Sequence, residues 1–320
     1  NLLMRLRHAQ LLKLHKIVKR YTIIMTDFRS VNMVYRYLLF LGLILGACVK
    51  NNPDPAWLEV TEWMLEANPT LNGEDGQLTH NLTDAWVYVD EQLIGVFEVP
   101  FKIPILKEGS ASIRLYPTIR VNGIAATKMR NEHMVPFEVT GVFVKNQTLT
   151  LAPITHYKNN VNIWTEDFED INIKLTDDPN TSSASLTLAN DSLKWFNGNY
   201  YGKVLLSAQD SMWVAYTNQD QQLTIPKNKQ AMLEIDYCNS VPFTNYLLFV
   251  NSNGTNENAM VTMNKSPLTS LRWKKVYILL SEVITAGPNN TNYVQAFRAF
   301  YDSTIASNLI LIDNIKVVYF

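Results

Sequence analysis

The chain has 320 residues, of which 47 % are hydrophobic and 18 % are charged, and its formal net charge is −1. A hydrophobic share of this size can fill a large core, and it excludes a charge-rich disordered protein. The basic residues are concentrated at the start, because residues 1–47 hold eight Lys or Arg and a single acid, Asp27. The remainder is acidic, which argues against a nucleic-acid-binding protein.

The first predicted element is an export signal. An apolar run at residues 38–47 follows the basic segment, and about ten residues are too few for a spanning helix, which needs roughly 20. The run ends in Leu45-Gly46-Ala47-Cys48, which resembles the lipobox of bacterial lipoproteins. The resemblance implies lipidation of Cys48. Met33 opens a signal of ordinary length, so we expect residues 1–32 to be an upstream artefact.

The resemblance also gives the expected location. Acylation of Cys48 implies a membrane partner and an outer-membrane lipoprotein, with residues 48–55 as a lipidated tether. Some surface lipoproteins of the Bacteroidota carry an acidic export signal after the cysteine. Residues 50–54 contain only one acid, Asp54, so the periplasmic and cell-surface faces both remain open.

Residues 56–155 predict a first β-sandwich. Alternating apolar and polar residues occur at 85–90, 112–116 and 148–151, and turn dipeptides such as Asn72-Gly73 and Asn122-Gly123 lie between such runs. The residues Val87–Asp90, Ile94-Gly95, Pro100 and Glu108-Gly109 resemble PEGA-type surface domains. The resemblance implies a small spacer or adhesion module rather than an enzyme.

Residues 160–320 predict a second β-sandwich, so the predicted fold class is all-β, with two sandwiches in series after the signal peptide. The opening Glu166-Asp167-Phe168-Glu169, the middle strand at 233–237 and the closing Ile312-Asp313-Asn314-Ile315 resemble jelly-roll domains that include many carbohydrate-binding modules. In these domains the closing strand lies beside the opening strand. Cys238 lies in an alternating segment and is predicted to be a buried free thiol.

Metal and ligand residues were sought among carboxylates and aromatic side chains. Glu166 and Glu169 lie near the start of the jelly roll and Asp313 near its end, and oxygen ligands brought together there suit a structural Ca²⁺. The alternative is a solvated acidic rim. Five aromatic residues in an amide-rich region are candidates for a glycan-binding platform, with a protein-contact surface and core packing as the alternatives: Trp195, Tyr200, Tyr201, Trp213 and Tyr216.

Three Asp-Ser steps resemble acceptor sites for O-glycosylation in the Bacteroidota, which implies modification of Ser192, Ser211 and Ser303. Ordinary turns are the alternative. The chain contains no hydrolase, nucleotide-binding or metalloprotease motif, so we expect no catalytic residues and no cofactor other than calcium.

The sequence therefore predicts a non-catalytic binding or scaffold component of an outer-membrane assembly, with an outer-membrane protein as its partner. The alternative is a glycan-binding lipoprotein that captures polysaccharide. A glycoside-active enzyme ranks third.

Overall fold

The computed structural model describes residues 53–191 and 198–320. Every described helix and strand lies within one compact unit, Asp54–Phe320. The described residues form β-sheets with very little helix, so the predicted all-β fold is confirmed. Among them, no helix has the length and apolar character needed to cross a membrane. Cys48 and the predicted signal region lie outside the described residues.

The first sandwich contains a three-stranded sheet in the order β5–β1–β9 and a five-stranded sheet in the order β4–β3–β6–β7, with β8 also pairing with β6. A short pair, β2–β10, lies beside them. The strands are β1 (Ala56–Val60), β2 (Met64–Leu65), β3 (Asp84–Val89), β4 (Gln92–Glu98), β5 (Phe101–Ile105), β6 (Gly109–Arg120), β7 (Lys128–Arg130), β8 (Phe137–Phe143), β9 (Thr148–Leu151) and β10 (Ile154–Thr155), with the 3-10 helix η1 at Pro69–Leu71.

Alternation of burial explains why these segments form a sandwich. Leu58 of β1, Val87 of β3 and Leu115 of β6 are fully buried, whereas their neighbours along each strand are more exposed. One face of each sheet therefore enters the core. The hairpin between β3 and β4 turns at Asp90 and Glu91, which both have positive φ, 47° and 62°. A tight turn therefore joins β3 and β4.

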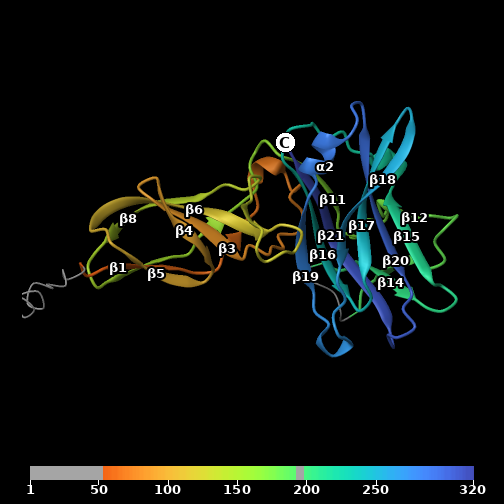
Figure 1. Ribbon diagram of the computed structural model, residues 1–320, viewed down its shortest axis with the longest axis horizontal. Helices are drawn as coiled ribbons and strands as arrows, with labels where there is room; N and C mark the ends of the chain where they lie inside the picture. The colour runs from red at the N-terminus through yellow and green to blue at the C-terminus, as the bar shows by residue number, and fades with distance from the viewer. Residues whose placement is uncertain (1–52, 192–197) are drawn as a thin grey trace, which may run out of the picture. The chain divides into compact units, whose positions relative to one another are not determined.

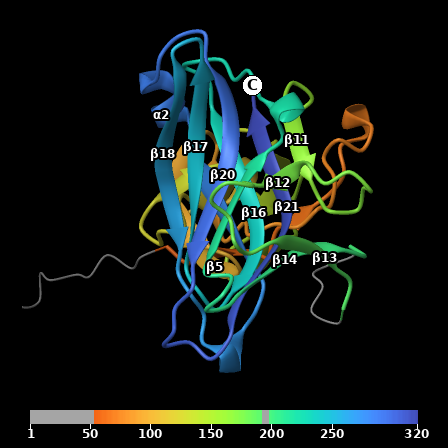
Figure 2. The same ribbon diagram turned by 90° about the vertical axis from the view of Figure 1, so that its right-hand side faces the viewer.

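The jelly roll has two facing sheets, seen in Figures 1 and 2. We call them the β16 sheet, in the order β13–β14–β21–β16–β19 with β11 also on β21, and the β17 sheet, in the order β12–β15–β20–β17–β18. The strands are β11 (Asn162–Glu166), β12 (Leu175–Asp177), β13 (Leu186–Ala189), β14 (Tyr201–Leu206), β15 (Met212–Thr217), β16 (Ala231–Asn239), β17 (Phe243–Asn251), β18 (Gly254–Met263), β19 (Lys274–Leu279), β20 (Asn292–Phe300) and β21 (Asn308–Tyr319). The helices are η2 (Gln219–Gln221), η3 (Leu268–Ser270) and α2 (Ser281–Ala286).

The closing strand lies beside the opening strand, as predicted. β11 pairs antiparallel with β21, with Ile163 opposite Val318. Between the two sheets lies a core that includes Ile235, Leu247 and Phe297, all fully buried. The jelly roll is thus closed by residues from both ends of its sequence.

The two sandwiches also share buried residues. Tyr277 of β19 and Val318 of β21 belong to the hydrophobic cluster of the first sandwich. Val121 forms an isolated bridge with Tyr277, and the backbone N–H of Asn122 donates to the carbonyl of Tyr277 at 2.7 Å. These contacts join the two predicted sandwiches within one compact unit.

Candidate functional site

The outer face of the β17 sheet carries an ordered row of side chains. Tyr216 of β15 lies opposite Ala296 of β20, and Ala296 lies opposite Tyr246 of β17. Both tyrosines are partly exposed. Neighbouring strands lie about 4.8 Å apart, so the Cα atoms of the two tyrosines lie about 10 Å apart, across two strand spacings. Ala296, between the two tyrosines, is 4 % exposed and buried.

An apolar strip continues this row along the strands. Leu248 and Val294 form a separate buried cluster with Ala296, and Tyr216, Tyr246 and Val250 pack against it. Leu247 and Phe249 point into the opposite, core side of the same sheet. Because successive side chains in a strand alternate between faces, the β17 sheet is apolar on both sides. Its outer face therefore carries a small buried apolar cluster beneath the partly exposed Tyr216, Tyr246 and Val250.

Polar groups border the strip. The guanidinium of Arg298 lies 4.8 Å from the centre of the Tyr246 ring, and its Nη2 lies 3.1 Å from Oε2 of Glu257. On the other side, the Tyr216 hydroxyl donates to Oδ2 of Asp178 at 2.6 Å. Burial, together with this hydrogen bond, raises the pKa of Tyr216 to about 12. The face thus combines aromatic rings with fixed donors and acceptors. We call it the tyrosine face, defined by Tyr216, Tyr246, Leu248, Val294, Ala296, Arg298 and Glu257.

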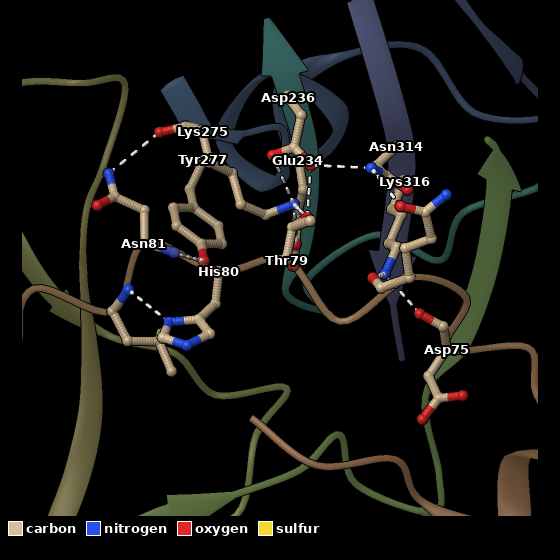
Figure 3. A network of polar contacts seen from close by, with 12 residues as sticks. Asp75, Thr79, His80, Asn81, Glu234, Asp236, Lys275, Tyr277, Asn314 and Lys316 are labelled. Atoms are coloured by element: carbon tan, nitrogen blue, oxygen red, sulfur yellow. Dashed lines mark hydrogen bonds and ion pairs between the residues drawn. The ribbon is translucent and has the colours of Figure 1, made fainter. Parts of the chain in front are cut away.

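The outer face of the β16 sheet is covered instead. Residues 75–82 of the first sandwich cross it, and Figure 3 shows the polar network beneath them. Lys275 Nζ lies 3.3 Å from Oε2 of Glu234 and 3.4 Å from Oδ1 of Asp236, and the three side chains are at most 2 % exposed. The Thr79 hydroxyl donates to Asp236 at 2.5 Å and accepts from Lys275 Nζ at 3.1 Å.

Backbone groups of the covering segment complete this network. The Lys316 ammonium donates to the carbonyls of Asp75 and Gln77, and the Asn81 N–H donates to the Tyr277 hydroxyl at 3.0 Å. Burial, together with the nearby Lys275 charge, lowers the pKa of Lys316 to about 8. Burial also lowers the pKa of Lys275, but the attraction of Asp236 and Glu234 outweighs it, so that pKa is raised. The charged groups of this network therefore bind one another and residues 75–82, which cover them.

The predicted aromatic platform is not gathered at one place. Trp213 is fully buried, stacks on Phe297 with ring centres 6.1 Å apart, and donates its indole N–H to Asp177. Tyr201 is also fully buried and donates to Asp191. Tyr200 is 40 % exposed, at the start of β14. Tyr216 alone among these described residues belongs to the tyrosine face, and Trp195 lies outside the described residues.

Sequence reasoning missed Tyr246, Arg298 and Glu257. Residues 246–250 are apolar at every position, so no alternation there separates the core face from the outer face. Only the pairing of β17 with β20 and β18 brings these three side chains together. The exposed polar residues of β18 were the one sequence signal that pointed to this face, because they indicate a strand at the edge of a sheet.

The predicted calcium ligands are engaged elsewhere. Glu166 accepts from the backbone N–H groups of Phe168 and Lys174, and Glu169 accepts from Asn199 and Tyr200. In the described ranges, no three His, Cys, Asp or Glu side chains are grouped to hold a metal ion. One observation favours a cation: Oδ2 of Asp313 is buried and, within the described residues, has no hydrogen-bond partner.

Glu166, Glu169 and Asp313 together do not form a calcium site in this structure. Calcium binding stays a prediction, and it can be tested directly. If an ion is held by Asp313, adding a chelator should lower the melting temperature, because a ligand that binds only the folded state stabilises it. An unchanged melting curve would remove the prediction.

The remaining predicted sites lie on turns or outside the described residues. Ser211 and Ser303 are exposed, as an acceptor for O-glycosylation must be, and Ser192 lies outside the described residues. Cys238 is a buried free cysteine, as predicted, and burial raises the pKa of its thiol. Modification of the serines stays a prediction.

No protein-family model matches the chain, and no curated protein is similar to it in sequence. Solved structures with a similar fold include carbohydrate-binding modules of the β-sandwich superfamily with promiscuous specificity (13 % identity, TM-score 0.35), which cover 72 % of this chain and 83 % of the matched one. The family 11 carbohydrate-binding module of Clostridium thermocellum, solved with a mixed-linked tetrasaccharide, has 13 % identity and a TM-score of 0.33, and covers 49 % of this chain and 94 % of its own.

Another match is the enzymatically active domain of tailspike protein 4 from bacteriophage CBA120, at 11 % identity and a TM-score of 0.35. It covers 47 % of this chain, and this chain spans only 20 % of the tailspike. These similarities concern β-sandwich architecture, and they assign no ligand to this chain.

Proposed function

We propose that this chain is a non-catalytic carbohydrate-binding protein and that its ligand lies across the tyrosine face. The observation that carries the proposal is the row Tyr216–Ala296–Tyr246, with two partly exposed rings on either side of a small residue. The C–H-rich face of a sugar ring packs on a flat aromatic side chain, while its hydroxyl groups need donors and acceptors at the edge.

The polar groups of the face match the second requirement. Arg298 and Glu257 are paired, so together they supply donors and acceptors without a net charge. The Tyr216 hydroxyl and the Asp178 carboxylate form a second fixed pair. A neutral sugar chain gains hydrogen bonds from such pairs, whereas a strongly charged ligand would have to separate one of them. We therefore expect a neutral glycan.

The test uses the full chain on a glycan array, followed by calorimetric titration of the best binder. Replacing Tyr246→Ala or Tyr216→Ala should weaken binding at least tenfold, which corresponds to about 1.4 kcal/mol. The matched control is Tyr200→Ala, an exposed tyrosine away from the tyrosine face, which should leave binding unchanged. Loss of binding with Tyr200→Ala alone would refute the tyrosine face as the site.

We also propose that the chain is held at the outer membrane by acylation of Cys48. Support comes from the sequence alone: a basic segment, a short apolar run and the four residues 45–48. Replacing Cys48→Ser should move the protein from the membrane fraction to the soluble fraction. An unchanged distribution, or an intact mass without acyl chains at that cysteine, would contradict the anchor.

A further inference from the structure

A separate cavity lies in the first sandwich, beside the covering segment. Its volume is about 1010 Å³, and three segments line it, residues 61–65, 77–80 and 152–154, together with Pro100. Cavities that bind ligands have volumes of roughly 300–1,000 Å³. This cavity is at the upper end of that range, and it contains none of the residues of the tyrosine face.

The walls of the cavity are mainly apolar. Trp63 is only 3 % exposed, and its indole N–H donates to the carbonyl of Asp84 at 3.0 Å. Pro100 and Pro153 add two ring side chains. Met64 and Ile154 also line the cavity and are still 56 % and 38 % exposed. Large apolar side chains left in solvent around an apolar cavity are typical of a site that a larger ligand covers.

One neutral donor faces this cavity. Nδ1 of His80 accepts from the backbone N–H of Leu82 at 3.5 Å, which places the ring proton on Nε2. Figure 3 shows the imidazole pointing away from the buried ionic network. Burial, then the charge of Lys275, lowers the pKa of His80, so the ring is uncharged near neutral pH.

One anionic acceptor completes the lining. Among the lining residues, all of which the structure describes, Glu62 is the one with a charged side chain, and its carboxylate is exposed. It is close enough to His80 to act on the pKa of that ring. An acidic ligand would meet the Glu62 charge without a cation to offset it, whereas a basic group would pair with it.

We propose that this cavity binds an extended, apolar peptide segment with one basic side chain, supplied by a partner protein. The apolar side chains of the segment would fill the cavity and cover Met64 and Ile154, and the basic group would pair with Glu62. His80 would donate from Nε2 to a carbonyl of the segment. A peptide fits better than a small molecule because Met64 and Ile154, which line the cavity, leave apolar surface in solvent that an extended ligand would cover.

The test measures the fluorescence anisotropy of two labelled peptides with the full chain. Both are short sequences of valine and leucine, one with a central lysine and one with a central glutamate. The lysine peptide should bind saturably and at least tenfold more tightly than the glutamate peptide. Replacing Glu62→Lys should reverse that order. Equal binding of both peptides, no saturable binding, or no effect of Glu62→Lys would overturn the proposal.

A second pair of variants locates the site. Ile154→Lys removes an apolar contact from the lining and adds a positive charge that repels the lysine side chain, so it should weaken binding of the lysine peptide at least tenfold. Leu205→Lys changes an apolar residue of β14 that is 58 % exposed, and it should have no effect. Equal losses with both variants would mean general adhesion to apolar surface and would overturn the proposal. Tyr246→Ala should leave peptide binding unchanged, so this test fails independently of glycan binding.

Discussion

The outer faces of the two jelly-roll sheets differ in how deeply their charged side chains are buried. On the β16 sheet, Glu234, Asp236 and Lys275 are buried and bind one another and the covering segment. On the β17 sheet, Arg298 and Glu257 remain partly exposed beside two tyrosines. The same architecture thus presents one face closed by a buried ionic network and one face open to solvent. Burial, rather than residue type, therefore separates the charged groups that bind the covering segment from those that remain accessible in this molecule.

The largest expected effect is on the closed face. Lys275→Met leaves Glu234 and Asp236 buried without their cation, and breaking a buried ion pair in this way costs about 3–5 kcal/mol. Urea unfolding of the full chain would measure it. Lys265→Met is the matched control, because Lys265 and its partner Asp302 are exposed and such pairs contribute about 0–1 kcal/mol. Equal losses from the two variants would contradict the difference between the faces.

A second effect is a dependence on pH at the junction of the two sandwiches. His133 is fully buried, its Nε2 lies 3.2 Å from the carbonyl of Gln230, and burial lowers its pKa to about 4. Because the unfolded chain binds a proton at His133 from about pH 6.5 downward and the folded chain does not, stability contributed there is lost as the pH falls from about 6.5 to 4. The loss is at most about 3 kcal/mol.

Melting temperatures of the native chain and of His133→Asn across this range would check that prediction. As the pH falls, the melting temperature of the native chain should decrease more than that of His133→Asn. A difference that stays constant with pH would show that His133 does not titrate with unfolding.

The smallest expected effect is on the open face. Arg298→Ala removes a partly exposed ion pair and a cation–π contact, each of which contributes about 0.5–1 kcal/mol at such sites. Stability should therefore change by no more than about 2 kcal/mol, while glycan binding falls. Calorimetric titration beside urea unfolding would separate the two effects. A large loss of stability with unchanged glycan binding would show that Arg298 stabilises the fold and does not contact the glycan.

The sequence predicted the sheets well because their signals are local. Alternation in segments such as 233–238 and the turn at Asn122-Gly123 reflect backbone geometry that neighbouring residues determine. The end strands β11 and β21 were placed side by side by resemblance to jelly rolls. The closed face could not be predicted, because an alternating strand with Glu234 and Asp236 on one side reads as solvent-facing. That side is buried only because residues 75–82, about 150 residues away in the sequence, cover Glu234 and Asp236.

The covering segment, residues 75–82, has a consequence for how the chain can be divided. It belongs to the first sandwich, yet it supplies the lid over the charges of the second. A chain cut near residue 160 would expose Lys275, Lys316, Glu234 and Asp236 to water on this face of the β16 sheet. We therefore expect the isolated jelly roll to lack the buried ionic network of the full chain, so that it cannot be transferred as an independent module.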